Sequence, residues 1–347
     1  MKDCAKFPFS LSAIVLAISL TILSPDSLAQ TQMVLVTTGS TMPEPLYVLW
    51  GDEYHKLHPD TQLRYLPVGT SESAKQVLSG VGDLGGGDAP IPEEQLKGAT
   101  HAALELPTVL VGIAIFYNVP GSVTSIRLSG PVLANIFLGK TISWNDPEIV
   151  KLNPDSKLPD LPIKVLHRTD GKGSNYIFSD FLSKLSPEFR TKVGANVSPK
   201  WPVGDAFSRC QDLLASAAKT PGAIGYAELR CGEKSGLSIA RIRNAAGEFV
   251  KPSTKSISDV AMAMEPKMRD DFRVSLTNAP GKESYPIVSF TWFYVPVRPQ
   301  DSQRRDAVKE YLTWVYASGQ EIAQAQGYAP LPPSVLQKVR AKVAALH

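Results

Sequence analysis

The sequence is poor in the residues from which metal sites are built. Its 347 residues include three cysteines and five histidines, and no histidine lies at ligand spacing around Cys210 or Cys231, which argues against zinc. His55 and His58, three residues apart on an expected helix, more simply face solvent. The chain also lacks an H-E-x-x-H motif and an EF-hand loop, so we expect no metal and no cofactor.

Excess charge of one sign is equally scarce. The 36 lysines and arginines nearly balance the 33 aspartates and glutamates, which leaves a net charge of +3 at pH 7. No stretch gathers basic residues into a stripe, so no nucleic-acid partner is expected. The motifs of phosphate-binding loops and of serine hydrolases, G-x-x-x-x-G-K-[ST] and G-x-S-x-G, are missing as well, and we find no nucleophile paired with a base.

A run of apolar residues typical of a targeting segment occurs once, near the N-terminus. Residues 11–23 are largely apolar, follow Lys2 and Lys6, and lead to the small residues Ser27 and Ala29. This order is typical of a secretory signal peptide, and the run is shorter than the ~20 apolar residues of a membrane-spanning helix. We predict a signal peptide over residues 1–29, cleavage after Ala29 and a periplasmic mature protein, with an uncleaved anchor as the alternative.

The cysteines then fall into two groups. Cys4 lies in the predicted signal peptide and leaves with it. Cys210 and Cys231 remain as an even pair in an oxidising compartment, which predicts a disulfide between them. Two free buried thiols are the alternative.

The rest of the chain alternates short strands with amphipathic helices. Strands are expected at residues 33–36 and 63–68, each followed by a turn and a helix, at residues 43–57 and 71–78. A further strand–turn–helix unit spans residues 163–185. This alternation predicts an α/β fold whose layers surround a mainly parallel sheet.

Two apolar, β-branched and aromatic runs divide the chain. Residues 107–117 and 286–297 have the composition of fully buried strands, and the helical segments near the C-terminus have little room to form a domain alone. We predict two α/β lobes, each a mainly parallel sheet flanked by helices, with a hinge of two crossing segments. Residues 30–114 and 292–347 would form lobe 1, and residues 115–291 lobe 2. A cleft between such lobes is the usual ligand site.

Three strand–turn–helix junctions place glycine and a hydroxyl at the start of a helix: Gly39-Ser40-Thr41-Met42, Gly69-Thr70-Ser71 and Gly171-Lys172-Gly173-Ser174. Unpaired backbone N–H groups and the positive end of the helix dipole meet there, which favours an anion. The alternative is that Thr41, Thr70 and Ser174 are only helix N-caps.

Two charged residues lie near these junctions. Arg168 precedes the third one, and an arginine fork can hold two oxygens of a tetrahedral oxyanion, with Asp170 fixing its orientation; a surface ion pair is the alternative. Asp88 follows a run of glycines, where a plain turn is the usual reason for such a residue. In an anion site Asp88 would be repulsive unless the ligand donates a proton to it, a condition that phosphate near neutral pH meets and sulfate does not.

Several segments together resemble a known family. The chain is similar to the periplasmic phosphate-binding proteins that deliver phosphate to an ABC transporter, the PstS-like family, over essentially the whole mature chain. The main matching segments are Thr41-Met42-Pro43-Glu44-Pro45-Leu46-Tyr47, Val68-Gly69-Thr70-Ser71, Gly87-Asp88-Ala89-Pro90 and Arg168-Thr169-Asp170-Gly171-Lys172-Gly173-Ser174. Their combination is highly specific, although none is specific alone.

The resemblance implies a two-lobed periplasmic-binding-protein fold that closes on one inorganic phosphate ion. The first lobe would provide Thr41, the backbone N–H of Met42, Thr70 and Asp88, with Asp88 accepting the phosphate proton. The second lobe would provide Arg168, supported by Asp170, together with Gly173 and Ser174. The partners implied are ABC permease subunits in the inner membrane, and we expect a monomer because a receptor of this kind needs both lobe faces free.

This chain departs from the family pattern at three of these positions. Met42 replaces a phenylalanine whose contact is through the backbone, and Thr70 replaces a serine and keeps the hydroxyl. Lys172 replaces a serine whose hydroxyl touches the ligand. Lys172 would add a charge to the site, admit a larger phosphorylated ligand, or point into solvent.

Other functions compete with phosphate capture. A receptor for another oxyanion or for a phosphorylated compound is the alternative that Lys172 raises. A secreted phosphatase using the same cleft would need a nucleophile–base pair or a metal set, neither of which the sequence contains, so we expect no enzyme. An adhesion or secretion-accessory protein that reuses the fold is a further alternative, because fold does not determine function.

Overall fold

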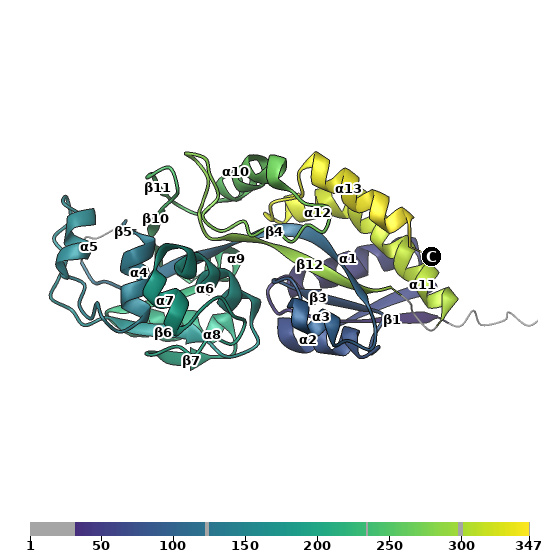
Figure 1. The fold of residues 1–347 in the computed structure, drawn as a ribbon, viewed down its shortest axis with the longest axis horizontal. Helices are drawn as coiled ribbons and strands as arrows, with labels where there is room; N and C mark the ends of the chain where they lie inside the picture. The colour runs from purple at the N-terminus through teal and green to yellow at the C-terminus, as the bar shows by residue number, and fades with distance from the viewer. Residues whose placement is uncertain (1–31, 122–124, 234, 298–300, 347) are drawn as a thin grey trace, which may run out of the picture. The chain divides into compact units, whose positions relative to one another are not determined.

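Two long antiparallel strands, β4 (Ala103–Tyr117) and β12 (Val288–Pro296), run side by side through the molecule (Figure 1). The computed structural model describes residues 32–121, 125–233, 235–297 and 301–346, so the predicted signal peptide lies outside the described residues. Nearly every residue of both strands is buried, as expected for the two apolar runs.

The strands β4 and β12 join two blocks of parallel strands. In one block β2 and β3 pair with β1, and β3 also pairs with β12. In the other block β7 and β8 pair with β6, and β8 also pairs with β4. The spatial order is β2 (Thr61–Pro67), β1 (Met33–Gly39), β3 (Leu84–Gly87), β12, β4, β8 (Ala223–Glu228), β6 (Lys164–Arg168) and β7 (Asp205–Phe207).

Short strands complete the sheets. β9 (Ser238–Ile239) pairs with β4. A separate three-stranded sheet has the order β11 (Phe249–Val250), β10 (Arg241–Arg243) and β5 (Arg127–Leu128). The α/β prediction is confirmed. The predicted lobe boundaries at residues 114/115 and 291/292 both fall inside the two long strands, and they stay a prediction.

Helices flank these strands in sequence order. They are α1 (Glu44–Leu57), α2 (Thr70–Leu78), α3 (Glu93–Lys97), α4 (Gly130–Phe137), α5 (Pro147–Leu152), α6 (Gly173–Leu185), α7 (Pro187–Lys192), α8 (Cys210–Lys219), α9 (Leu229–Gly232), α10 (Thr254–Met264), α11 (Ser302–Trp314), α12 (Gln320–Ala325) and α13 (Pro333–Ala344). A 3₁₀ turn at Glu265–Lys267 follows α10, and a π-helical turn at Val315–Gly319 follows α11. The helices α11 and α13 pack against each other, and α11 also contacts β1, so the C-terminal segment returns to the first block of strands.

The glycine run before Asp88 forms a strand and not the turn that such a run usually makes. Gly85, Gly86 and Gly87 are buried in β3, opposite the aromatic residues of β12. A Cβ added at Gly87 would overlap the ring of Tyr294, because Tyr294 reaches over β3 to donate a hydrogen bond to the carbonyl of Ala89 at 2.5 Å. Glycine is therefore required here by close packing.

We predict that Gly87→Ala destabilises the fold by about 1 to 3 kcal/mol, the usual cost of overpacking a tight interior. Urea denaturation measures this free energy of unfolding. Gly98→Ala is the matched control, since Gly98 is exposed and an added Cβ there has its nearest neighbour at 3.4 Å; it should change stability by less than about 0.5 kcal/mol. Equal effects of the two substitutions would contradict the packing argument.

Candidate functional site

The three glycine-containing junctions converge because parallel strands carry their carboxyl ends to one place. The segments after β1, β3 and β6 border a cavity of about 280 Å³, as expected for ligand sites at the carboxyl ends of strands in α/β sheets. Predicted site residues line this cavity from both blocks of strands. They are Thr41, Met42, Asp88, Arg168, Lys172, Gly173 and Ser174. Their roles in binding stay predictions.

Asp88 is a fully buried carboxylate with one oxygen satisfied and one not. Its Oδ2 accepts hydrogen bonds from the hydroxyls of Ser40 and Thr70, the latter at 3.4 Å. Its Oδ1 is buried and has no partner among the described residues. Thr70 does not line the cavity, but its hydroxyl also accepts the backbone N–H of Asp88 at 3.3 Å.

Burial dominates the ionisation of Asp88. It raises the pKa of this carboxyl to about 7, against the lowering effect of the hydrogen bonds from Ser40 and Thr70. The positive charges of Arg168 and Lys172 lower the pKa by smaller amounts. An unpaired, desolvated carboxylate oxygen is costly, so this position favours a ligand that brings a hydrogen-bond donor.

Arg168 faces Asp88 from the other block of strands. The residue is 6% exposed, and its guanidinium donates from Nε to the carbonyl of Phe207 at 3.2 Å and from Nη2 to the carbonyl of Ser208 at 2.6 Å. Burial lowers the pKa of Arg168 from its ordinary value. Two of the five N–H groups of an arginine are therefore occupied, which leaves three for an oxyanion.

Lys172, Gly173 and Ser174 begin helix α6. Lys172 is its N-cap residue, and Gly173 and Ser174 are its first two residues, whose backbone N–H groups have no partner within the helix. Burial, followed by the charge of Arg168, lowers the pKa of Lys172. The ammonium group is thus partly withdrawn from water rather than directed wholly into solvent.

The interpretation of the three hydroxyls as mere N-caps is wrong. Pro43, Gly69 and Lys172 are the N-cap residues of α1, α2 and α6, and none of the three caps uses a side-chain hydrogen bond. Thr70 and Ser174 lie inside the first turns of their helices and are buried. Their hydroxyls are free for another role.

The two walls of the cavity touch each other directly. Gly173 lies against Asp88, so closely that a Cβ at Gly173 would overlap the carboxylate. The backbone N–H of Ser71 donates to the carbonyl of Gly171 at 3.3 Å. The junctions after β2 and β6 are therefore in contact, and the described conformation is a closed one.

The structure does not bring together two of the predicted pairs. No hydrogen bond or ion pair joins Asp170 to Arg168 in the described part of the chain; two backbone carbonyls hold the guanidinium instead. The role of Asp170 stays a prediction. The N–H of Met42 donates to the hydroxyl of Ser40 at 3.1 Å, so this predicted ligand donor has a partner within the protein.

Sequence reasoning missed several residues of the cavity wall. Ser40 bonds to Asp88, although only its neighbours were predicted to act. Glu228, Arg230 and Tyr328 also line the cavity; the Arg230 guanidinium lies over the Tyr328 ring at 4.7 Å from its centroid, and burial raises the pKa of Glu228 to about 7. Ser40 could have been found from its place in the first glycine junction, whereas no local motif marks the other three.

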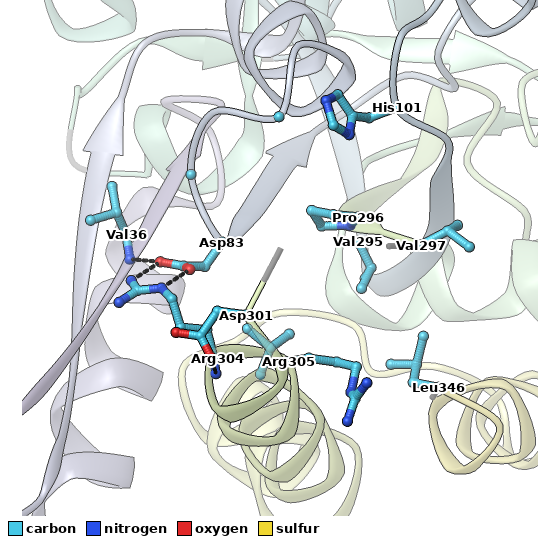
Figure 2. A pocket seen from close by; sticks show the side chains of 13 residues that line it. Val36, Asp83, His101, Val295, Pro296, Val297, Asp301, Arg304, Arg305 and Leu346 are labelled. Atoms are coloured by element: carbon cyan, nitrogen blue, oxygen red, sulfur yellow. Dashed lines mark hydrogen bonds and ion pairs between the residues drawn. The ribbon is translucent and has the colours of Figure 1, made fainter. Parts of the chain in front are cut away.

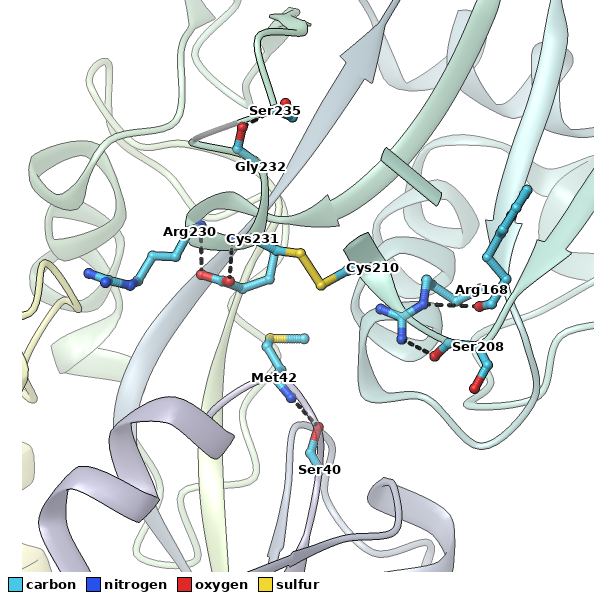
Figure 3. Close-up of a disulfide and its surroundings, with 11 residues drawn as sticks. Ser40, Met42, Arg168, Ser208, Cys210, Arg230, Cys231, Gly232 and Ser235 are labelled. Carbon is cyan, nitrogen blue, oxygen red and sulfur yellow. Dashed lines mark hydrogen bonds between the residues drawn. A yellow bond between two sulfur atoms is a disulfide. The ribbon is translucent and has the colours of Figure 1, made fainter. Parts of the chain in front are cut away.

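The predicted disulfide between Cys210 and Cys231 is confirmed. Both cysteines line the same cavity. Figure 3 shows the bridge with Ser40 and Met42 on one side and with Arg168 and Ser208 beyond Cys210. It joins α8 to α9, two elements of the second block of strands.

A second cavity has a different character. It measures about 430 Å³ and is lined partly by the apolar residues Val36, Val295 and Val308. The Asp83 carboxylate in its wall accepts two hydrogen bonds of 2.5 Å from Arg304 and one of 2.7 Å from the N–H of Val36 (Figure 2). This ion pair fastens α11 to the first block of strands, and its charges satisfy each other.

Two classes of site were also sought across the described ranges. No three His, Cys, Asp or Glu side chains of those residues are grouped so as to hold a metal ion. No helix among them has the length and apolar character needed to cross a membrane.

Comparisons with known proteins agree on one family. A sequence model of the PBP superfamily domain matches residues 24–318. The phosphate-binding protein PstS of Pasteurella multocida is 33% identical over 331 residues, which cover 95% of this chain and 94% of the relative. PstS of Xylella fastidiosa is 32% identical over 324 residues, which cover 92% and 87% of the two chains.

Solved structures share the fold. A high-affinity periplasmic phosphate-binding protein solved with phosphate, PfluDING, has a TM-score of 0.71 at 20% identity, with 89% of this chain and 93% of that chain covered. An ABC-type phosphate transport receptor from Vibrio cholerae has a TM-score of 0.60 at 17% identity, with 86% and 100% covered. The likeness shows the two-lobed binding-protein fold.

The buried carboxylate of Asp88 has a measurable effect on stability. Its pKa of about 7 in the folded protein exceeds the ordinary 3.8, so between these values the folded state binds more protons than the unfolded chain, and the free energy of unfolding falls as pH rises. We predict that Asp88→Asn stabilises the ligand-free protein at about pH 8 by on the order of 2 kcal/mol. The gain should shrink at about pH 5.

Urea denaturation at both pH values checks this prediction. A gain that is the same at both pH values would contradict a buried charge at Asp88. Comparing Asp88→Asn with the unaltered protein at each pH removes the contribution of Glu228, whose pKa is raised in the same direction.

Proposed function

The chain belongs to the PstS family of phosphate-binding proteins, and from this we propose that it captures inorganic phosphate in the cavity between its lobes and delivers it to an ABC permease in the inner membrane. We infer further that the signal peptide is cleaved after Ala29, that the mature protein works in the periplasm as a monomer, and that it binds phosphate without catalysing a reaction. The named relatives are phosphate-binding proteins, which supports these inferences.

The unpartnered Oδ1 of Asp88 is the observation that carries the proposal. It is buried beside anion-binding groups, where a carboxylate would repel any anion that lacks a proton. Monohydrogen phosphate can donate its proton to this oxygen, and that hydrogen bond to a charged acceptor is a strong one. Sulfate has no proton near neutral pH and would leave two negative charges opposed.

The remaining groups suit the other phosphate oxygens. The free N–H groups of Arg168 can hold two oxygens side by side, and the N–H groups of Gly173 and Ser174 offer donors at the positive end of α6. The hydroxyls of Thr41 and Ser174 also line the cavity. These groups come from both lobes, so phosphate would favour the closed conformation over an open one.

Asp88 should therefore decide between phosphate and sulfate. In calorimetric titrations at about pH 8, with protein stripped of ligand by unfolding and refolding, we expect one phosphate per chain and no competition from sulfate. Asp88→Asn should weaken phosphate binding about 10- to 100-fold, the cost of one hydrogen bond to a charged group. The same variant should bind sulfate better, because the amide donates to it.

The matched control is Asp83→Asn. Asp83 belongs to the same lobe and its side chain is only 10% exposed, but it is paired with Arg304 away from this cavity. That variant should keep the selectivity. If Asp88→Asn still rejects sulfate, the proton-acceptor role is wrong, and if the unaltered protein binds no phosphate, the proposed function itself is wrong.

Lys172 should contribute charge to phosphate binding. Its ammonium is partly buried and interacts with Asp88 and Arg168, so we expect Lys172→Ser to weaken phosphate binding roughly 5- to 10-fold at low salt and less at high salt, where screening is stronger. Lys164→Ser is the control, because Lys164 is exposed at the opposite end of β6. An unchanged phosphate Kd together with competition by glycerol phosphate would assign Lys172 to a larger phosphorylated ligand.

A further inference from the structure

The guanidinium of Arg168 takes its orientation from one short segment. Its two internal acceptors are the carbonyls of Phe207 and Ser208, and the neighbouring N–H of Thr169 donates to Phe207 as well, at 3.0 Å. A charged group that is 6% exposed has few ways to be satisfied. The direction of its three other N–H groups therefore depends on where these two carbonyls lie.

That segment is weakly anchored by ordinary packing. Phe207 ends β7, a three-residue strand at the edge of the sheet that pairs only with β6. Every residue from 205 to 212 is exposed or half-exposed, and the first buried side chain after them is that of Leu213. Edge strands with little buried area open at low cost in free energy.

The disulfide supplies the missing anchor. Cys210 lies two residues after Ser208, and its sulfur is bonded to that of Cys231. Cys231 is held in turn, because its N–H donates at 3.0 Å to the Glu228 carboxylate, which also accepts the N–H of Arg230 at 2.9 Å. Glu228 ends β8, which is buried throughout and pairs with β4.

We propose that the Cys210–Cys231 disulfide is a positioning element for Arg168: it ties the carbonyls of Phe207 and Ser208 to the buried strand β8 and thereby directs the free N–H groups of Arg168 into the cavity. This inference rests on the proposed function, since phosphate is the ligand whose affinity reports it. Without the bridge, the edge segment moves, and Arg168 loses its fixed direction while remaining in the protein. Phosphate then binds with part of its contacts unformed.

A double-mutant cycle tests this role with inorganic phosphate. The variants are Cys210→Ala/Cys231→Ala, Arg168→Lys and their combination in the full mature chain. Removing the disulfide should weaken phosphate binding about tenfold when Arg168 is present, which is less than the loss of one charge-assisted hydrogen bond at its strongest. With Arg168→Lys already in place it should weaken binding less than about twofold, because lysine has no fork for the two carbonyls to orient.

A merely structural role predicts a different cycle. Loss of the bridge would then weaken binding by the same factor in both backgrounds, and that result would overturn the proposal. Asn153→Ala is the control for general destabilisation: Asn153 is buried in the same lobe and bonds to the backbone of Arg127 and Ile149, outside the phosphate cavity. It should lower the melting temperature and leave the phosphate Kd unchanged.

A second variant keeps the test decisive if the chain without the disulfide does not fold. Ser208→Gly/Arg209→Gly retains the bridge and loosens the exposed link between Cys210 and the two carbonyls. It should weaken phosphate binding several-fold, again only when Arg168 is present. An unchanged Kd in this folded variant would overturn the proposal, whereas failure of the unaltered protein to bind phosphate would overturn the proposed function instead.

Discussion

The pairing of β4 with β12 is the constraint on which the rest of the structure depends. Their register runs from Ala103 opposite Pro296 to Gly112 opposite Val288, with an irregularity between Phe290 and Trp292. Near this irregularity, buried hydroxyls of Thr108 and Thr291 bond to each other at 2.5 Å and both bond to Tyr47. A slip of one residue would turn every buried side chain to the other face, so these polar contacts hold the register. Both parallel blocks are built outward from this pair, and their strand ends meet at one cavity for that reason.

Charge balance in the cavity follows from burial. Asp88 and Arg168 approach from opposite walls, both withdrawn from water, and burial shifts both pKa values toward the neutral form. Neither charge is neutralised by direct contact with the other: Asp88 is bonded to hydroxyls and Arg168 to backbone carbonyls. Each group thus keeps bonding capacity toward the cavity. A site arranged in this way favours an anion that is also a proton donor, because such a ligand satisfies the acceptor and the donors together.

Close approach of the backbone serves the same site. Gly87 lets Tyr294 cross over β3 and bond to Ala89, next to Asp88, and Gly173 lets α6 begin directly against the Asp88 carboxylate. A side chain at either position would separate the walls or displace the carboxylate. The disulfide acts on a different weakness, the exposed edge segment that carries the carbonyls holding Arg168. Glycine and cystine therefore have complementary roles: the glycines permit contact across the cavity, and the bridge prevents motion in its wall.

The sequence by itself determined the α/β class, the two buried strands, the main helices and the cysteine pair, because apolar periodicity and an even cysteine count are local properties of the chain. It also indicated most of the residues that line the cavity, since a glycine and a hydroxyl at a helix start form a recognisable motif. Only the tertiary structure decided that Arg168 is held by Phe207 and Ser208 rather than by Asp170, and that Ser40, Glu228, Arg230 and Tyr328 belong to the wall. These contacts join segments far apart in the chain, and backbone carbonyls carry no side-chain signature, so they exist only once the strands have paired.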